Sequence, residues 1–306
     1  MKLIAKNIKI IIKTGITLSL LSGLSALTAN AQLNPMGGLF FQNQYLGNPA
    51  MAGLERGMNL NVGVRQQWSA MPGTPKTQSL TADYSAGKKV GLGLNIHNDE
   101  AGLLKRTRAM ATYSYHLPLN DESQKLHFGV SFGFMDERVM NEQINGDQSD
   151  MSVGKFNQRE TYMDGDFGIA YTGKKVSLQV AVPNMKSFLK KDQINSSVDR
   201  STFFSSASYR FSFDQTLDGL DVEPKIAYRG VYGYEDIFDM GANLSFAKRR
   251  ANIMAMYHST ESATFGMGVS FNNMALNGMY STETSALRGY VSGNFELNLK
   301  MNLFGK

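Results

Sequence analysis

The chain has 306 residues, with 31 lysines and arginines against 26 acidic residues and no cysteine. The missing cysteines exclude a small fold held together by disulfides. Four of the lysines lie in the first 31 residues, which hold no acidic residue, so the remainder has 27 basic and 26 acidic residues and a net charge of +1. We therefore expect no nucleic-acid partner.

The first 31 residues have the pattern of a secretory signal peptide. Four lysines precede an apolar stretch over residues 15–29, and Ala29-Asn30-Ala31 forms a small-residue cleavage site. Residues 1–31 are therefore predicted to be removed during export. No later apolar run approaches the ~20 residues that a membrane helix needs, so the mature chain crosses a membrane only if strands cross it.

Alternation with a period of two predicts strands throughout the mature chain. Around residues 126–134, large apolar residues alternate with small or polar ones, and Phe295 and Leu297 alternate with Glu296 and Asn298. Such runs predict about 14 strands, in chain order at 58–68, 76–85, 88–97, 106–118, 125–137, 161–172, 175–182, 200–213, 221–234, 237–248, 250–259, 263–272, 274–283 and 287–300.

The lengths of these strands and of their connections favour a membrane barrel. A tilted membrane strand needs ~9–11 residues, whereas strands of soluble proteins are usually nearer ~5–6. If both termini are periplasmic, the short connections lie on the periplasmic side of the membrane. The two longest connections, 138–160 and 184–199, then lie on the extracellular side. The sequence therefore predicts an all-β fold, a transmembrane antiparallel β-barrel of about 14 strands in the outer membrane. Its divisions are a signal peptide (1–31), an N-terminal segment that is periplasmic or a plug (32–57), and the barrel (58–306).

The polar strand faces give no pattern that indicates catalysis or metal binding. No G-x-S-x-G frame surrounds a serine, and no histidine pair has metal-ligand spacing. We therefore expect no catalytic, cofactor or metal site, with the four histidines facing the lumen or lying at its rim: His97, His116, His127 and His258. Glycines with a period of two are interpreted as small lumen residues that let strands curve and a plug approach closely: Gly91, Gly93, Gly129, Gly133, Gly266 and Gly268. Charged residues of both signs on the polar face predict a lumen whose charged side chains pair with one another. A pore selective for one sign of charge is less favoured.

Several motifs resemble those of one family in their order along the chain. Gln44-Tyr45 is followed by Asn48-Pro49-Ala50-Met51-Ala52-Gly53, and further pieces match at residues 65–68, 72–77, 91–93, 98–102 and 113–119. The sequence resembles the PorP/SprF family of Bacteroidota over roughly residues 40–135. That resemblance implies an outer-membrane component of the type IX secretion system. It would help to export or surface-anchor a cargo, such as an adhesin or gliding-motility protein, through the cargo's C-terminal domain, or it would join the core machinery.

The resemblance also implies partners and candidate residues. The implied partners are the cargo's C-terminal domain, other type IX components, periplasmic lipoproteins and membrane lipid. Candidate partner-binding or plug residues are Asn48, Pro49, Gly53, Arg65, Trp68, Asp99 and Gly102. Asn48-Pro49 is equally interpretable as a turn initiator, and Trp68 as a residue of the membrane–water girdle.

We expect the cargo-facing surface at loops 69–75, 98–105, 138–160 and 184–199, because loops carry function on a rigid scaffold. Two rival functions stay open at this point. One is an outer-membrane channel for small or hydrophobic solutes, and the other is a lipid-modifying barrel enzyme.

Overall fold

The computed structural model describes residues 36–67, 73–120, 123–140, 157, 161–185, 201–213, 218–231, 235–285, 289 and 291–305. Trp68 and nearly all of 138–160 and 184–199 lie outside this part of the chain. Within it, no helix combines the length and the apolar character required to cross a membrane.

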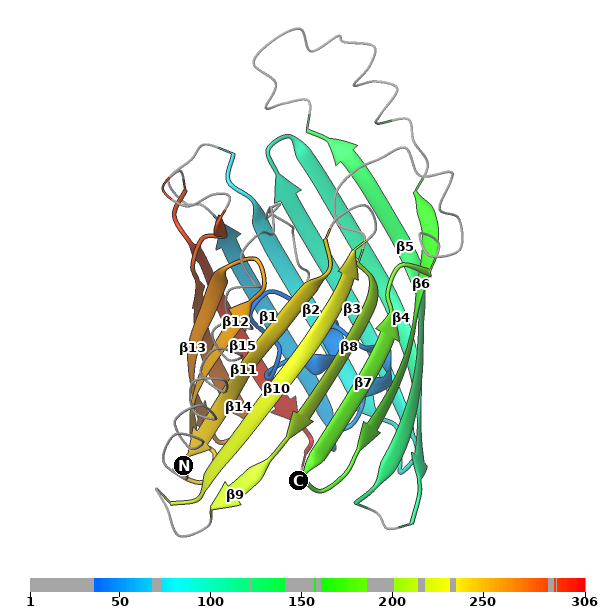
Figure 1. Ribbon diagram of the computed structural model, residues 1–306. Coiled ribbons are helices and arrows are strands. Elements are labelled where there is room, and N and C mark those ends of the chain that lie inside the picture. The colour runs from blue at the N-terminus through cyan, green and yellow to red at the C-terminus, as the bar shows by residue number, and fades with distance from the viewer. Residues whose placement is uncertain are drawn as a thin grey trace, which may run out of the picture.

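The chain forms strands that tilt around a common axis (Figure 1). They are β1 (Met58–Gln67), β2 (Lys76–Ser85), β3 (Val90–Ala101), β4 (Leu104–Pro118), β5 (Lys125–Val139), β6 (Tyr162–Thr172), β7 (Val176–Val182), β8 (Ser201–Tyr209), β9 (Phe211–Phe213), β10 (Leu220–Val231), β11 (Ile237–Phe246), β12 (Ala251–His258), β13 (Ser262–Phe271), β14 (Met274–Ser281) and β15 (Asn294–Leu303).

Antiparallel pairing closes the strands into a barrel. Apart from β8 and β9, each strand pairs with its neighbours in the sequence, and β1 pairs with β15, so the sheet returns on itself. The short β9 continues β8 after a break at Arg210, since both pair with β10. They count as one strand, so the predicted 14-stranded antiparallel barrel is confirmed. The pairing of β1 with β15 removes the two free edges that an open sheet would expose to lipid.

The two faces of the sheet have opposite polarity. Large apolar side chains point outward. For example, Phe132 is 58% exposed and Leu297 is 61% exposed. Inward-facing polar side chains such as Asn298 and Thr81 are almost fully buried. A water-soluble barrel would place apolar residues inside, whereas an apolar outer band around a polar lumen suits a bilayer.

Two predicted boundaries are wrong for the same physical reason. The sequence predicted a loop at 98–105, but β3 runs to Ala101 and β4 begins at Leu104, because the β3–β4 ladder continues to the pair Ala101–Leu104. The last strand was predicted at 287–300, but β15 spans Asn294–Leu303. It begins at Asn294 because its partners there, Gln67 and Ser281, are the final residues of β1 and β14.

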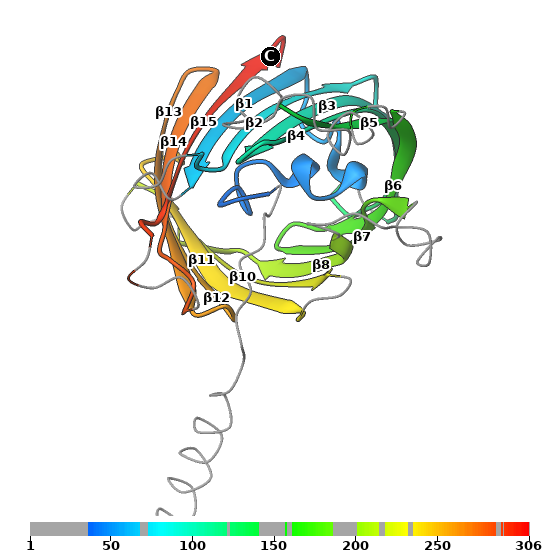
Figure 2. The same ribbon diagram turned by 90° about the horizontal axis from the view of Figure 1, so that it is seen from above.

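Residues 36–57 lie inside the ring of strands, as Figure 2 shows in blue. We name this segment the luminal segment. It contains two single-turn 3-10 helices, η1 (Gln44–Leu46) and η2 (Pro49–Met51). Its apolar side chains fill gaps in the otherwise polar lumen: Met36 and Phe40 pack with Phe204 and Met256. The segment is therefore buried among the strands and contributes its own apolar clusters.

Candidate functional site in the barrel lumen

Asn48 fixes the luminal segment to the wall at the seam between β6 and β7. Its Oδ1 accepts a hydrogen bond from the Ala50 N–H (2.9 Å), which forms the turn that starts η2. Its Nδ2 donates toward the carbonyls of Ile169 (3.2 Å) and Val180 (3.4 Å), which are opposite each other in the β6–β7 ladder. One side chain thus caps the turn and bridges two strands.

Glycines in the wall let η2 and the residues after it approach the sheet closely. A Cβ atom on Gly129 would lie 2.2 Å from the Ala50 nitrogen, and one on Gly91 would lie 2.1 Å from the Ala52 oxygen. No such contact is sterically possible, so both positions require glycine. Ser114 Oγ, beside Gly91, donates to the same Ala52 oxygen (2.7 Å).

Not every glycine in the period-two runs has this role. A Cβ on Gly133 would meet the backbone of the neighbouring strand at Ala109, and one on Gly268 would meet the side chain of Asn277. Both glycines therefore make room for neighbouring strands of the barrel wall. Their interpretation as contact sites for a plug does not apply.

Gly53 ends the segment's run along the wall. Its φ of +71° lies in the left-handed region that favours glycine, and a Cβ there would lie 2.5 Å from the Gly91 Cα. Its N–H donates to Asp83 Oδ2 (2.9 Å), which also accepts from Asn59 Nδ2 (3.2 Å). The motif from Asn48 to Gly53 is therefore bound to the barrel at both ends.

The first half of the luminal segment is held by side chains from distant strands. Glu296 Oε2 accepts from the Gly38 N–H (2.7 Å), and Lys225 Nζ donates to the Phe40 carbonyl (2.7 Å). Asn43 Nδ2 donates to Thr81 Oγ1 (2.9 Å). These contacts join the segment to β15, β10 and β2, so it is fixed on several sides of the lumen.

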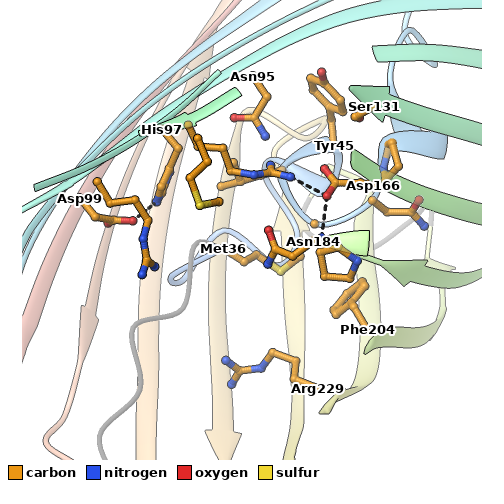
Figure 3. Close-up of a pocket in the computed structure, with 18 residues that line it drawn as sticks. Met36, Tyr45, Asn95, His97, Asp99, Ser131, Asp166, Asn184, Phe204 and Arg229 are labelled. Atoms are coloured by element: carbon orange, nitrogen blue, oxygen red, sulfur yellow. Dashed lines mark hydrogen bonds and ion pairs between the residues drawn. The ribbon is translucent and has the colours of Figure 1, made fainter. Parts of the chain in front are cut away.

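Tyr45 lines two cavities in the lumen. Its hydroxyl is 2.7 Å from Thr112 Oγ1, and burial raises its pKa, so the hydroxyl stays neutral at physiological pH. It lines one cavity of about 100 Å³ together with Asn95, His97 and Asp166 (Figure 3). It also lines a second cavity of about 210 Å³ with Asn61 and Lys300. We name the first, which is nearer to Gly102, the upper cavity and the second the lower cavity.

A row of polar side chains crosses the wall on four adjacent strands. In register, Glu296 faces Arg65, Arg65 faces Thr77, and Thr77 faces Asp99. Arg65 Nη2 donates to Thr77 Oγ1 (3.1 Å), which donates to Asp99 Oδ1 (2.6 Å), and Asp99 Oδ2 is 2.8 Å from His97 Nε2. Because Glu296 also binds Gly38, this row is connected to the luminal segment.

The family is decided by comparison of the sequence with family models. The model described as type IX secretion system membrane protein PorP/SprF matches residues 29–301. The chain belongs to the PorP/SprF family. No curated protein sequence matches it.

Several solved structures match the chain with TM-scores below 0.5. Omp33 of Acinetobacter baumannii is 9% identical with a TM-score of 0.48, covering 82% of this chain and 100% of Omp33. CdiB from Acinetobacter baumannii is 8% identical with a TM-score of 0.40, covering 81% and 60% of the two chains. A triple mutant of Rhodopseudomonas blastica porin is 9% identical with a TM-score of 0.35, covering 80% and 99%.

The structure brings most of the candidate residues of this PorP/SprF protein into the lumen. Asn48, Pro49 and Gly53 belong to the luminal segment, and Arg65 and Asp99 belong to the polar row. Gly102 is apart from them, in the β3–β4 turn, with φ +58° and open space where a Cβ would be. Trp68 lies outside the described residues. A role in binding a partner stays a prediction for all seven.

Sequence reasoning missed one cluster around His258. Asp239 accepts from Arg229 Nε and Nη2 (both 2.8 Å) and is 2.6 Å from His258 Nδ1, while His258 Nε2 is 2.8 Å from Thr264 Oγ1. The order of acid, histidine and hydroxyl is that of a hydrolase triad. However, Thr264 is only 1% exposed and its hydroxyl is shared with Ser281 (2.7 Å). The cluster therefore joins neighbouring strands through buried hydrogen bonds. Only the register of the strands could have revealed it.

Proposed function

We propose that this PorP/SprF protein is a non-enzymatic outer-membrane barrel that binds a type IX secretion cargo through its C-terminal domain. It helps to export that cargo or to anchor it at the surface, with adhesins and gliding-motility proteins as the expected class. The observation that carries the proposal is the family match over residues 29–301 on a closed barrel that contains its own N-terminal segment. Joining the core secretion machinery is the variant of this role that the family equally supports.

The occupied lumen supports binding over diffusion. The luminal segment contacts strands on several sides of the barrel, and the lumen charges are largely paired, as in Arg108–Asp166 (2.5 Å) and Arg229–Asp239 (2.8 Å). A diffusion channel needs an open path whose lining groups bind solute weakly. A channel for small or hydrophobic solutes is therefore the second candidate, and it requires the luminal segment to leave.

The proposed arrangement divides the chain by compartment. Residues 1–31 are a signal peptide, residues 32–57 a plug, and residues 58–306 the barrel. Both termini face the periplasm, where other type IX components and lipoproteins are available. Gly57 and Phe304 lie at the end of the barrel that carries the tight β11–β12 and β13–β14 turns, which supports a common side for both ends.

Orientation is tested with inserted tags. A tag in the β3–β4 turn at Gly102, where there is open space, should bind antibody on intact cells, and a C-terminal tag should bind only after permeabilisation. The opposite result would place the termini outside and reverse the assignment of cargo-facing loops.

Cargo recognition is tested at residues 138–160, most of which lie outside the described part of the chain. Replacing them with a short Gly/Ser linker should leave the barrel assembled, because loop length changes closure entropy slowly. Surface display of the cargo should be lost, as measured by whole-cell labelling. Normal display would direct attention to residues 184–199, and normal display in a strain without the whole protein would overturn the proposed function.

A further inference from the structure

The upper cavity has polar groups that no part of the described chain satisfies. Asn95 Oδ1, His97 Nδ1 and Arg108 Nε are buried without a hydrogen-bond partner among the described residues. Asn95 and His97 are only 9% and 7% exposed, and both line the cavity (Figure 3). Buried polar atoms of native proteins are nearly always paired. These three atoms therefore indicate a ligand that supplies both a donor and an acceptor.

The charges around the cavity are already neutralised. Arg108 is paired with Asp166 (2.5 Å) and Arg106 with Glu137 (2.8 Å), and Asp99 Oδ2 lies 2.8 Å from His97 Nε2. Asp166 Oδ1 additionally accepts from the Asn184 N–H (3.0 Å). A site for a free anion would leave a cation in excess. The pairing instead favours a neutral ligand that forms hydrogen bonds.

Part of the lining is apolar and lies close to these polar groups. Leu46 and Met36 of the luminal segment contribute to it, together with Met135, Pro183 and Phe204. A ligand that fits therefore has an apolar group beside its polar one. A sugar would leave this lining unmatched, and a hydrocarbon would leave Asn95 and Arg108 unpaired.

We propose that the upper cavity binds an extended, uncharged peptide segment of a secretion partner. A backbone N–H donates to Asn95 Oδ1, a backbone carbonyl accepts from Arg108 Nε, and an apolar side chain contacts Phe204 and Met135. Extended peptides expose this combination of donor, acceptor and side chain at each residue. The inference rests on the proposed function, since it names the part of a partner that the barrel recognises.

The test uses the purified full-length protein in detergent and the peptide acetyl-Thr-Leu-Thr-Leu-Thr-amide. Binding is measured by ligand-observed NMR on the wild type and on Asn95→Leu, which removes the unpaired acceptor with little change in volume. We expect the wild type to bind and Asn95→Leu to bind about tenfold more weakly, the loss typical of one buried hydrogen bond. No binding to the wild type, or equal binding to both, would overturn the site.

Asn61→Leu is the matched control. Asn61 is also a buried asparagine whose Oδ1 has no partner among the described residues, but it lines the lower cavity. The Asn61→Leu variant should bind the peptide as the wild type does, and equal weakening in both variants would overturn the assignment of binding to the upper cavity. Acetate and maltotriose serve as competing probes. If either binds with the same sensitivity to Asn95→Leu, the assignment to peptide is wrong.

A measurement of cargo display in cells distinguishes this inference from the proposed function. Asn95→Leu should reduce cargo display when it replaces the wild-type protein. If display is lost without the protein but is normal with Asn95→Leu, the cavity inference fails and the proposed function stands.

Discussion

Asn48 donates hydrogen bonds to two strands of the barrel wall from a single side chain. Its oxygen closes the turn at Ala50, and its nitrogen reaches carbonyls of both β6 and β7. A Cβ on the neighbouring Gly168 would lie 2.0 Å from Asn48 Oδ1, so the wall is shaped to admit this side chain. The motif that signals the family in the sequence is thus a docking element in the fold.

Asn48→Ala should lower the free energy of unfolding by about 1–3 kcal/mol, because it leaves buried backbone groups with fewer partners. Urea unfolding in detergent or lipid measures the change. Asn43→Ala is the control, since Asn43 donates one described side-chain hydrogen bond, to Thr81. It should cost less than Asn48→Ala. Equal costs would mean that the bridge across β6 and β7 contributes nothing to stability.

Gly129→Ala tests the close approach of η2 to the wall. The new Cβ would overlap the backbone at Ala50, so η2 must shift, and we expect a loss of about 1–3 kcal/mol in stability. Gly278→Ala is a matched strand glycine whose nearest contact would be an ordinary 3.6 Å to Leu297. Thermal unfolding should separate the two variants. A normal melting temperature for Gly129→Ala would show that the segment is not held against β5.

At the scale of elements, the luminal segment depends on the barrel for its structure. Its two 3-10 helices have three residues each, far too short to be stable alone. Its hydrogen bonds to the strands reach residues 28 to 258 positions away in the sequence, from Gly57–Ser85 to Gly38–Glu296. The strands, in contrast, satisfy their backbones through each other. We therefore expect the barrel to survive loss of the segment, but not the reverse.

Deleting residues 36–52 should convert the protein into an open pore. A barrel of about 14 strands is wider than the ~8-stranded barrels that side chains alone can fill. Conductance in planar lipid bilayers should rise well above that of the full-length protein. The urea midpoint of the purified deletion variant shows whether the barrel is intact. Unchanged conductance of an intact barrel would mean that wall side chains close the lumen unaided.

At the scale of the molecule, one closed sheet separates two solvents. Phe128, Phe132, Phe295 and Leu297, the large apolar residues of the alternating runs in the sequence, are all exposed on the outer surface. The four histidines, which were expected to face the lumen or its rim, are all buried. Because side chains alternate between the two faces of each strand, apolar residues lie outside and polar residues inside. The barrel therefore needs no apolar core of its own.

Phe132→Arg should cost about 2–4 kcal/mol in the bilayer, since Phe132 lies in the middle of β5 and points outward. Phe304→Arg is the control, because Phe304 is 85% exposed just beyond the end of β15, where the cost should be ~0–1 kcal/mol. Refolding into lipid vesicles over a urea series measures both. A small cost at Phe132 would contradict a lipid-facing position.

The sequence by itself determined which residues form strands, which face of each strand is apolar and which family the chain resembles. Those properties are local, because alternation, turn residues and the motif from Asn48 to Gly53 are each read from a few neighbouring residues. Tertiary structure decided where β3 and β15 end, because a strand continues only while its partners do. It also decided which glycines meet the luminal segment, that His258 meets Asp239, and that Asn95 and Arg108 line one cavity. Each of these depends on the register of strands far apart in the sequence, which a period of two leaves undetermined.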